Sequence, residues 1–172
     1  VGTLFCWSMP PACATGRDAD QGQTPIKNGL CLLELVINYN HNSTNTKAYM
    51  THPDIHFELT GDQQEVAVIR LTRGAKRNAL NDGLILALRD LFEKMPSTVR
   101  AAVIDGEGPH FCAGLDLSEL KERDAGQGLH HSRMWHAALE RVQYGPVPVI
   151  AALHGAVVGG GLELASACHI RV

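Results

Sequence analysis

Several features that would point to a particular class of protein are missing from this 172-residue sequence. Its five cysteines form no C-x-x-C pair, and their odd number, without a secretion signal, predicts reduced thiols in a cytoplasmic protein. The formal net charge is only −3, so we expect no broad basic surface and no nucleic-acid partner. The longest apolar runs are too short to span a bilayer, which predicts no membrane partner. The nine histidines show no spacing typical of zinc sites, so no metal is expected.

The first 49 residues lack the patterning of the rest of the chain. A polar tract at 38–46 has no periodicity, whereas alternating hydrophobicity begins shortly after Met50. We therefore interpret 1–49 as an N-terminal extension, poorly ordered or non-native, with Met50 as the natural start. A genuine but loosely packed N-terminal arm is the alternative. Residues 50–172 are interpreted as the N-terminal part of a folded domain.

From Met50 onward, strand and helix patterns alternate. Alternation over 55–59 and 66–71, separated by the turn signal Gly61-Asp62, predicts a hairpin. Asn81 or Asp82 is expected to cap a helix that ends at Pro96 and buries one apolar face: Leu84, Leu88, Leu91, Phe92 and Met95. The other expected features are a strand at 101–104, a helix start at 116–120, a chain break at 126–128, a helix at 131–144 burying Met134, Trp135, Ala138 and Val142, a strand at 147–153 and a helix at 162–168. This order predicts a layered α/β fold.

Three successive glycines, 159–161, stand where an apolar strand passes into an apolar helix. Glycines at a helix start leave backbone N–H groups open to a ligand, and the helix dipole there favours a negative oxygen. Glu163 follows in the first turn, and a carboxylate beside an oxyanion site suggests acid–base chemistry on a carbonyl compound. The plainer alternative is that the glycines permit tight packing and Glu163 only complements the helix dipole.

The loop at 108–117 has a second feature of this kind. Ala113-Gly114 before Asp116 permits a tight turn that exposes the N–H of Leu115, and Asp116 can cap the segment that follows. Alone, the loop is simply a capped turn. Together with Gly160, Leu115 would supply a second donor to one oxyanion.

Three segments in this order resemble the crotonase, or enoyl-CoA hydratase/isomerase, superfamily. They are Ala-Lys-Arg-Asn-Ala-Leu-Asn at 75–81, Phe-Cys-Ala-Gly-Leu-Asp-Leu at 111–117, and Pro-Val-Ile-Ala-Ala-Leu-His-Gly at 148–155, which leads through the glycines to Cys168. The resemblance covers about residues 55–172. It implies a crotonase-like spiral of strand–strand–helix turns, here incomplete at the C-terminus, and a homotrimer or hexamer in the full-length parent.

The resemblance also implies roles for individual residues. The backbone N–H groups of Leu115 and Gly160 would form the oxyanion hole for a thioester oxygen, and Glu163 would be the catalytic carboxylate. The residues implied to bind coenzyme A are Lys76, Arg77, Asn78, Ala79, Leu80, Ala113, Asp116 and Leu117. The acyl-CoA thioester is the substrate, and no separate cofactor is expected.

The function implied is that of an acyl-CoA-processing enzyme, with hydration of a trans-2-enoyl-CoA as the leading reaction. A second catalytic Glu, which hydratases supply from a segment further along the chain, would lie beyond Val172. Another crotonase activity, isomerase or hydrolase, therefore stays open. So does an inactive or non-catalytic acyl-CoA-binding or assembly protein.

Overall fold

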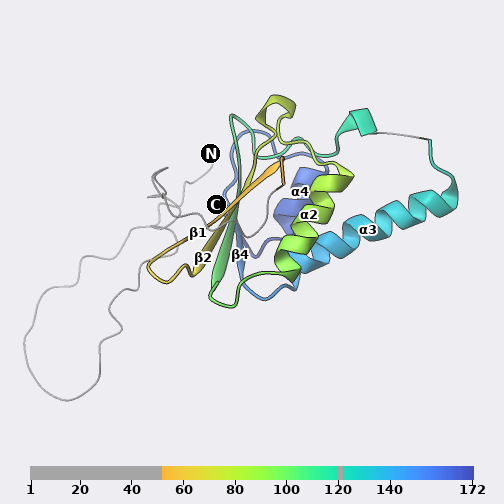
Figure 1. Ribbon diagram of the computed structural model, residues 1–172. Helices are drawn as coiled ribbons and strands as arrows, with labels where there is room; N and C mark the ends of the chain where they lie inside the picture. The colour runs from red at the N-terminus through yellow and green to blue at the C-terminus, as the bar shows by residue number, and fades with distance from the viewer. Residues whose placement is uncertain (1–51, 120–121) are drawn as a thin grey trace, which may run out of the picture. The chain divides into compact units, whose positions relative to one another are not determined.

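A computed structural model describes residues 52–119 and 122–172, which form one five-stranded sheet with three α-helices (Figure 1). The strands lie across the sheet in chain order: β1 (Ile55–Thr60), β2 (Val66–Leu71), β3 (Ala101–Gly106), β4 (Val149–Ala151) and β5 (Ile170–Arg171). The first pair is antiparallel and every later pair is parallel. The prediction of an α/β fold is therefore confirmed. The predicted extension at 1–49 lies outside the described residues.

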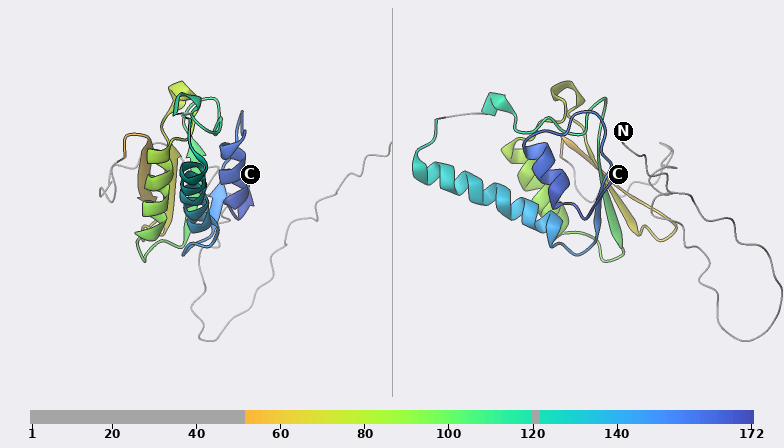
Figure 2. Two further views of the ribbon diagram at one scale, coloured as in Figure 1. Left: turned by 90° about the vertical axis from the view of Figure 1, so that its right-hand side faces the viewer. Right: turned by 180° about the vertical axis from the view of Figure 1, so that it is seen from behind.

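The three helices lie on one face of the sheet (Figure 1). They are α2 (Asp82–Glu93), α3 (Ala125–Gln143) and α4 (Gly160–Ala167), and α3 contacts both of the others. Figure 2 shows them side by side, with α3 in the middle. Each helix connects two neighbouring parallel strands, and because such crossovers are right-handed, strands laid down in one direction bring their helices to the same side. No helix in the described part of the chain is both long and apolar enough to cross a bilayer.

Several elements form where the sequence pattern places them. The hairpin of β1 and β2 pairs Ile55 with Leu71 and Thr60 with Val66. Asn81 caps α2, because its side-chain oxygen accepts a hydrogen bond from the Leu84 N–H at 2.7 Å. The face of α2 that packs on the sheet includes Leu84, Leu88, Leu91 and Phe92, all almost fully buried.

Some predicted boundaries are wrong. Gly126 and Gly128 do not break the chain but lie in the first turns of α3, which starts at Ala125. Asp124 and Gln127 form a reciprocal capping box there, at 2.8 and 3.2 Å, and this offsets the low helix propensity of the glycines. The helix start at 116–120 is a single 3₁₀ turn, η2 (Leu117–Glu119). Met95 lies beyond the end of α2, and Met134 is only partly buried.

Three connections meet at one edge of the sheet. The loops after β2, β3 and β4 all follow the carboxyl ends of parallel strands, which is where ligand sites in such sheets form. Isolated bridges join these loops to one another, between Leu80 and Leu115 and between Cys112 and Val157. The first loop also contains a short 3₁₀ turn, η1 (Gly74–Lys76).

Candidate functional site

The Leu115 turn, residues 111–116, is held as an added strand against the first loop. The Leu80 N–H donates to the Gly114 carbonyl at 2.7 Å, and the Asp116 N–H donates to the Leu80 carbonyl at 2.8 Å. In such a bridge the N–H of the intervening residue, Leu115, points away from the partner strand. It has no acceptor within the described residues. Gly114 has φ +91°, and a methyl group there would lie 2.7 Å from the Val158 carbonyl oxygen, so only glycine fits.

The Gly160 turn, residues 156–161, packs directly against the Leu115 turn. Cys112 connects the two, since its N–H donates to the Ala156 carbonyl and its own carbonyl accepts from the Val158 N–H, both at 3.1 Å. The N–H groups of residues 161–163 are used inside the turn and the first turn of α4, bonding to Val158 and Gly159. The N–H of Gly160 has no acceptor within the described part of the chain.

The two unpaired N–H groups are close neighbours. A methyl group built on Gly160 would lie 3.7 Å from the Leu115 nitrogen, and one built on Gly114 would lie 3.3 Å from the Gly160 nitrogen. Both residues line one cavity of about 290 Å³, together with Glu163 and four side chains of α3: His131, Ser132, Trp135 and His136. The structure thus brings together the three residues that the sequence singled out, Leu115, Gly160 and Glu163. Glu163 is exposed at this cavity.

Asp116 is the polar anchor of the Leu115 turn. Its Oδ2 accepts from the Arg73 guanidinium at 2.6 Å and from Lys76 Nζ at 2.9 Å, while its Oδ1 accepts from the Ser118 hydroxyl at 2.6 Å. Hydrogen bonds from Ser118, then Lys76 and Arg73, hold the pKa of Asp116 well below its usual range, although desolvation opposes them. The Asp116 carboxylate is almost fully buried and already occupied by these partners.

The side chains expected to bind coenzyme A fall into two groups. Asn78 and Leu80 are fully buried, and Asn78 Nδ2 donates to the carbonyls of Glu107 at 2.9 Å and His110 at 2.8 Å. Like the buried Asp116, these side chains hold the loops in place. Residues 78–80 could therefore contact a ligand only through their backbone atoms. The exposed or half-exposed members of the predicted set are Lys76, Arg77, Ala113 and Leu117. Their role in binding stays a prediction.

Arg73 was not singled out by the sequence. Its guanidinium donates to the Ala79 carbonyl and to Asp116, and lies 3.4 Å from Asp54. It therefore ties the loop after β2 to the Leu115 turn. The only feature of the sequence that could have pointed to Arg73 is its position just after a buried strand.

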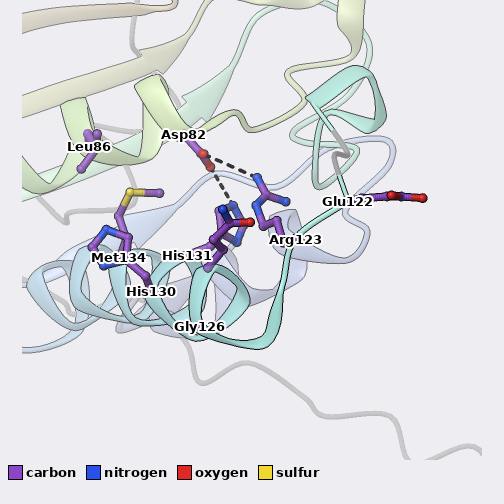
Figure 3. A pocket seen from close by; sticks show the side chains of 9 residues that line it. Asp82, Leu86, Glu122, Arg123, Gly126, His130, His131 and Met134 are labelled. Carbon is purple, nitrogen blue, oxygen red and sulfur yellow. Dashed lines mark hydrogen bonds and ion pairs between the residues drawn. The ribbon is translucent and has the colours of Figure 1, made fainter.

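A second feature missed by the sequence is a cluster around Asp82, at the start of α2 (Figure 3). Asp82 Oδ1 accepts from Trp135 Nε1 at 3.0 Å and bonds His131 Nε2 at 2.8 Å, and its Oδ2 lies 3.9 Å from Arg123. Desolvation raises the pKa of Asp82, but hydrogen bonds from Trp135 and His131 and the nearby positive charges outweigh it and lower the pKa overall. The signal available was the spacing of His131 and Trp135, four residues apart on one helix face.

The comparisons with known proteins agree with this architecture. The family model described as "Enoyl-CoA hydratase/isomerase" matches residues 61–172. The chain belongs to the enoyl-CoA hydratase/isomerase family, the crotonase superfamily that the sequence resembled.

Curated relatives within the family differ in the reactions for which they are named. The mouse mitochondrial Δ(3,5)-Δ(2,4)-dienoyl-CoA isomerase is 34% identical over 127 residues, 66% of this chain and 39% of the relative. The 2,3-dehydroadipyl-CoA hydratase of Escherichia coli is 37% identical over 118 residues, 66% of this chain and 45% of the relative. A 4-chlorobenzoyl coenzyme A dehalogenase of Arthrobacter is 36% identical over 113 residues, 62% of this chain and 41% of the relative.

Solved structures show the same fold. A Rhodopseudomonas palustris protein assigned as an enoyl-CoA hydratase is 57% identical, with a TM-score of 0.66 over 69% of this chain and 45% of its own. A Thermobifida fusca protein with the same assignment, solved in complex with CoA, is 28% identical, with a TM-score of 0.61 over 69% and 48%. The chain therefore spans less than half the length of the relatives described here.

Proposed function

We propose that this chain supplies the oxyanion-binding part of a site that processes acyl-CoA thioesters, and that the reaction is hydration of a trans-2-enoyl-CoA. The observation that carries the proposal is the convergence of the Leu115 and Gly160 N–H groups at one cavity with Glu163. Two fixed donors beside a carboxylate suit a reaction in which a thioester oxygen becomes negative while a proton moves nearby.

The expected contribution of the donors follows from their fixed geometry. Both N–H groups are set by backbone bridges, so they need no reorganisation when charge develops on the thioester oxygen. Each donor of this kind contributes about 3–4 kcal/mol to stabilising the transition state. Gly160 is also the first residue of α4, so the partial positive charge at that helix start acts on the same oxygen.

Glu163 is proposed to orient and deprotonate the water that attacks the β-carbon. It lies in the first turn of α4 and lines the cavity that both donors share. The exposed members of the predicted coenzyme A set, Lys76, Arg77, Ala113 and Leu117, are proposed to contact the coenzyme outside this cavity. Here the support comes from the family, one of whose structures is a complex with CoA. The cytoplasmic location and the homotrimer or hexamer expected from the resemblance remain proposals.

The test is turnover of crotonyl-CoA, followed as loss of enoyl absorbance, together with calorimetric binding of butyryl-CoA, a saturated thioester that cannot be hydrated. Glu163→Gln keeps the shape of the side chain and removes the base. It should lower turnover by roughly 100-fold or more while changing butyryl-CoA affinity only a few-fold. Glu140→Gln, an exposed substitution on α3, is the matched control and should behave like the parent.

Two results would count against hydration. If the Glu163→Gln variant turned over crotonyl-CoA about as fast as the parent, Glu163 would be only a helix-start residue and not the catalytic base. Binding of butyryl-CoA without turnover of any enoyl-CoA by the parent would instead support the non-catalytic, acyl-CoA-binding alternative.

A further inference from the structure

Trp135 of α3 joins the start of α2 to the oxyanion donor at the start of α4. Its indole N–H donates to Asp82 Oδ1 at 3.0 Å, and a methyl group built on Gly160 would lie 3.2 Å from its Cζ3 atom. Nε1 belongs to the five-membered ring and Cζ3 to the far side of the six-membered ring. One rigid side chain therefore contacts α2 at one end and the donor glycine at the other.

Asp82 is itself held in place from several sides. The oxygen that accepts from Trp135 also bonds His131 Nε2 at 2.8 Å, and Arg123 lies 3.9 Å from Oδ2. Figure 3 shows the Asp82 side chain directed toward both of these partners. Its backbone is bonded as well, since the Asp82 N–H donates to Glu119 Oε2 at 3.3 Å. The indole N–H of Trp135 therefore has a fixed acceptor.

The start of α4 depends on packing for its orientation. The residue at its cap position is Gly159, with φ +51°, which has no side chain to bond the first N–H groups. Glycines retain more backbone freedom than other residues, and the helix start lacks the bond that a capping side chain supplies. The atom nearest to a methyl group on Gly160 is Trp135 Cζ3, followed by Leu80 Cδ1 at 3.5 Å. The indole is therefore the side chain best placed to fix the direction of the Gly160 N–H.

We propose that Trp135, anchored by Asp82, is a positioning residue of the oxyanion hole and holds the Gly160 N–H on the same oxygen as the Leu115 N–H. The inference rests on the proposed function and deepens it. The cavity of about 290 Å³ that these two donors share is called the thioester cavity below. Asp82 does not line it, so Asp82 acts on the donors only through the indole.

The effect of losing this anchor follows from the geometry that the hole requires. Both donors must reach the thioester oxygen at once, and their bonds strengthen as that oxygen becomes negative. A displacement of about 1 Å can cost up to about 100-fold in rate. Release of the indole should therefore reduce turnover more than it reduces binding of a thioester whose oxygen carries no developing charge.

The activity test changes Asp82 and leaves every residue of the thioester cavity in place. Asp82→Leu removes the acceptor and should lower the turnover of crotonyl-CoA by roughly tenfold or more, while butyryl-CoA affinity changes only a few-fold. Asp82→Asn keeps an oxygen that accepts from the indole, so it should recover most of the lost turnover. Arg123→Gln is the matched control, because it removes another contact of the same carboxylate and leaves the bond to Trp135 intact. It should behave like the parent.

A spectroscopic test reports on the donors without turnover. Hydrogen bonds to the thioester oxygen weaken the C=O bond and lower its stretching frequency, which isotope-edited infrared spectra of ¹³C-labelled butyryl-CoA measure. The frequency of the bound ligand should be lowered equally by the parent, Asp82→Asn and Arg123→Gln, and less by Asp82→Leu. A variant that was only less stable would bind less ligand but would leave the frequency of the bound fraction unchanged.

The parent provides a further test that requires no variant of Asp82 to fold, which circular dichroism would check. Coupling between two sites is reciprocal. If the bond between Asp82 and Trp135 positions the Gly160 N–H, a ligand on that N–H must stabilise this bond. Exchange of the Trp135 indole proton with solvent should therefore slow by several-fold when butyryl-CoA binds. The sequence contains one other tryptophan, Trp7, and Trp7→Phe assigns the two indole signals.

The outcomes separate the two proposals. A parent that neither binds butyryl-CoA nor turns over crotonyl-CoA would overturn the proposed function, and the positioning role with it. With a parent that does either, three results would overturn only the positioning role. They are Asp82→Leu as active as Arg123→Gln, a carbonyl frequency that is the same in Asp82→Leu and the parent, and indole exchange that butyryl-CoA leaves unchanged. A loss of turnover that Asp82→Asn did not recover would assign the effect to the charge of Asp82 and would also overturn it.

Discussion

The Leu115 turn and the Gly160 turn present equivalent N–H groups but are held in place by different forces. The Leu115 turn is anchored by charge, through Asp116 and its contacts with Arg73, Lys76 and Ser118. The Gly160 turn has no charged anchor among the described residues. It is fixed by close approach, with Gly161 against Cys112 and Trp135 against Gly160.

This difference predicts different sensitivities. A turn held by an ion cluster responds to pH and salt, because both change the interaction of the charges. A turn held by contact between backbones responds to the addition of a single methyl group, because closely packed interiors cannot yield. The following substitutions test that contrast, beginning with the largest expected effect.

Gly161→Ala should be the most damaging change to stability. The added methyl group would lie 2.8 Å from Cys112 Cβ and 2.9 Å from Cys112 Sγ, in a buried position with no space to move. We expect a loss of about 3 kcal/mol in the free energy of unfolding, measured by urea titration. Gly128→Ala is the control, since nothing lies within 4 Å of its added methyl group and it should stabilise α3 by about 0.5–1 kcal/mol. Equal effects from both changes would contradict the steric account.

Gly160→Ala should separate catalysis from stability. Its methyl group would stand 3.7 Å from the Leu115 nitrogen, in the space where the two N–H groups meet, with only one tight contact, to Trp135. Turnover of crotonyl-CoA should fall by roughly tenfold or more, while stability changes by less than about 1 kcal/mol. Ser166→Ala, an exposed change on the same helix, should affect neither. A fully active Gly160→Ala would show that this space is not used by the substrate.

Asp116→Asn should make the Leu115 turn less stable only at pH values at which the Asp116 carboxylate of the parent is charged. The folded-state pKa of Asp116 is depressed, so its stabilising contribution is present above the unfolded value of about 3.9 and is lost as the pH falls toward the folded value. The urea midpoints of parent and Asp116→Asn should therefore differ at pH 6, and the gap should begin to narrow below about pH 3.9 and close only as the pH approaches the depressed folded-state pKa. Asp90→Asn, at a surface pair with Arg89, should give a smaller difference. A constant gap at all pH values would show that charge is not what anchors the turn.

Lys76→Gln should give the smallest effect. Lys76 is about half exposed and forms the outer of the two cationic contacts to Asp116, which Arg73 also holds. The expected loss is less than about 1 kcal/mol at low salt, and it should vanish near 1 M NaCl. Arg77→Gln is a suitable neighbour control. A loss that persists at high salt would mean that Lys76 acts through packing instead of charge.

Much of the fold was predictable because its signals are local. The alternation in β1 and β2, the Asn81 cap and the apolar face of α2 each depend on residues close together in the sequence. The start of α3 was not predicted because Gly126 and Gly128 were interpreted as a break in the chain. The capping box that Asp124 and Gln127 form was not recognised. Propensity alone was a poor guide there, since the capping interactions offset it.

The site was predictable only in part. The positions of Leu115, Gly160 and Glu163 followed from glycine-rich turns near strand ends and from the family motifs. The buried state of Asn78 and the bonds of Asp116 to Arg73 and Lys76 could not be predicted, because these partners lie 29–43 residues away in the sequence. The same holds for Asp82 with His131 and Trp135, which are 49 and 53 residues apart from it.

The bond from Asp82 to two residues of α3 also determines how that helix is turned about its own axis. Successive helical residues point about 100° apart, so residues four apart point only about 40° apart and can reach one oxygen. A rotation of α3 by one residue would carry both His131 and Trp135 away from Asp82 at once. Because Ala138 and Val142 continue the same side of the helix, the orientation selected at its polar half also decides which side chains of its other half are buried in the core.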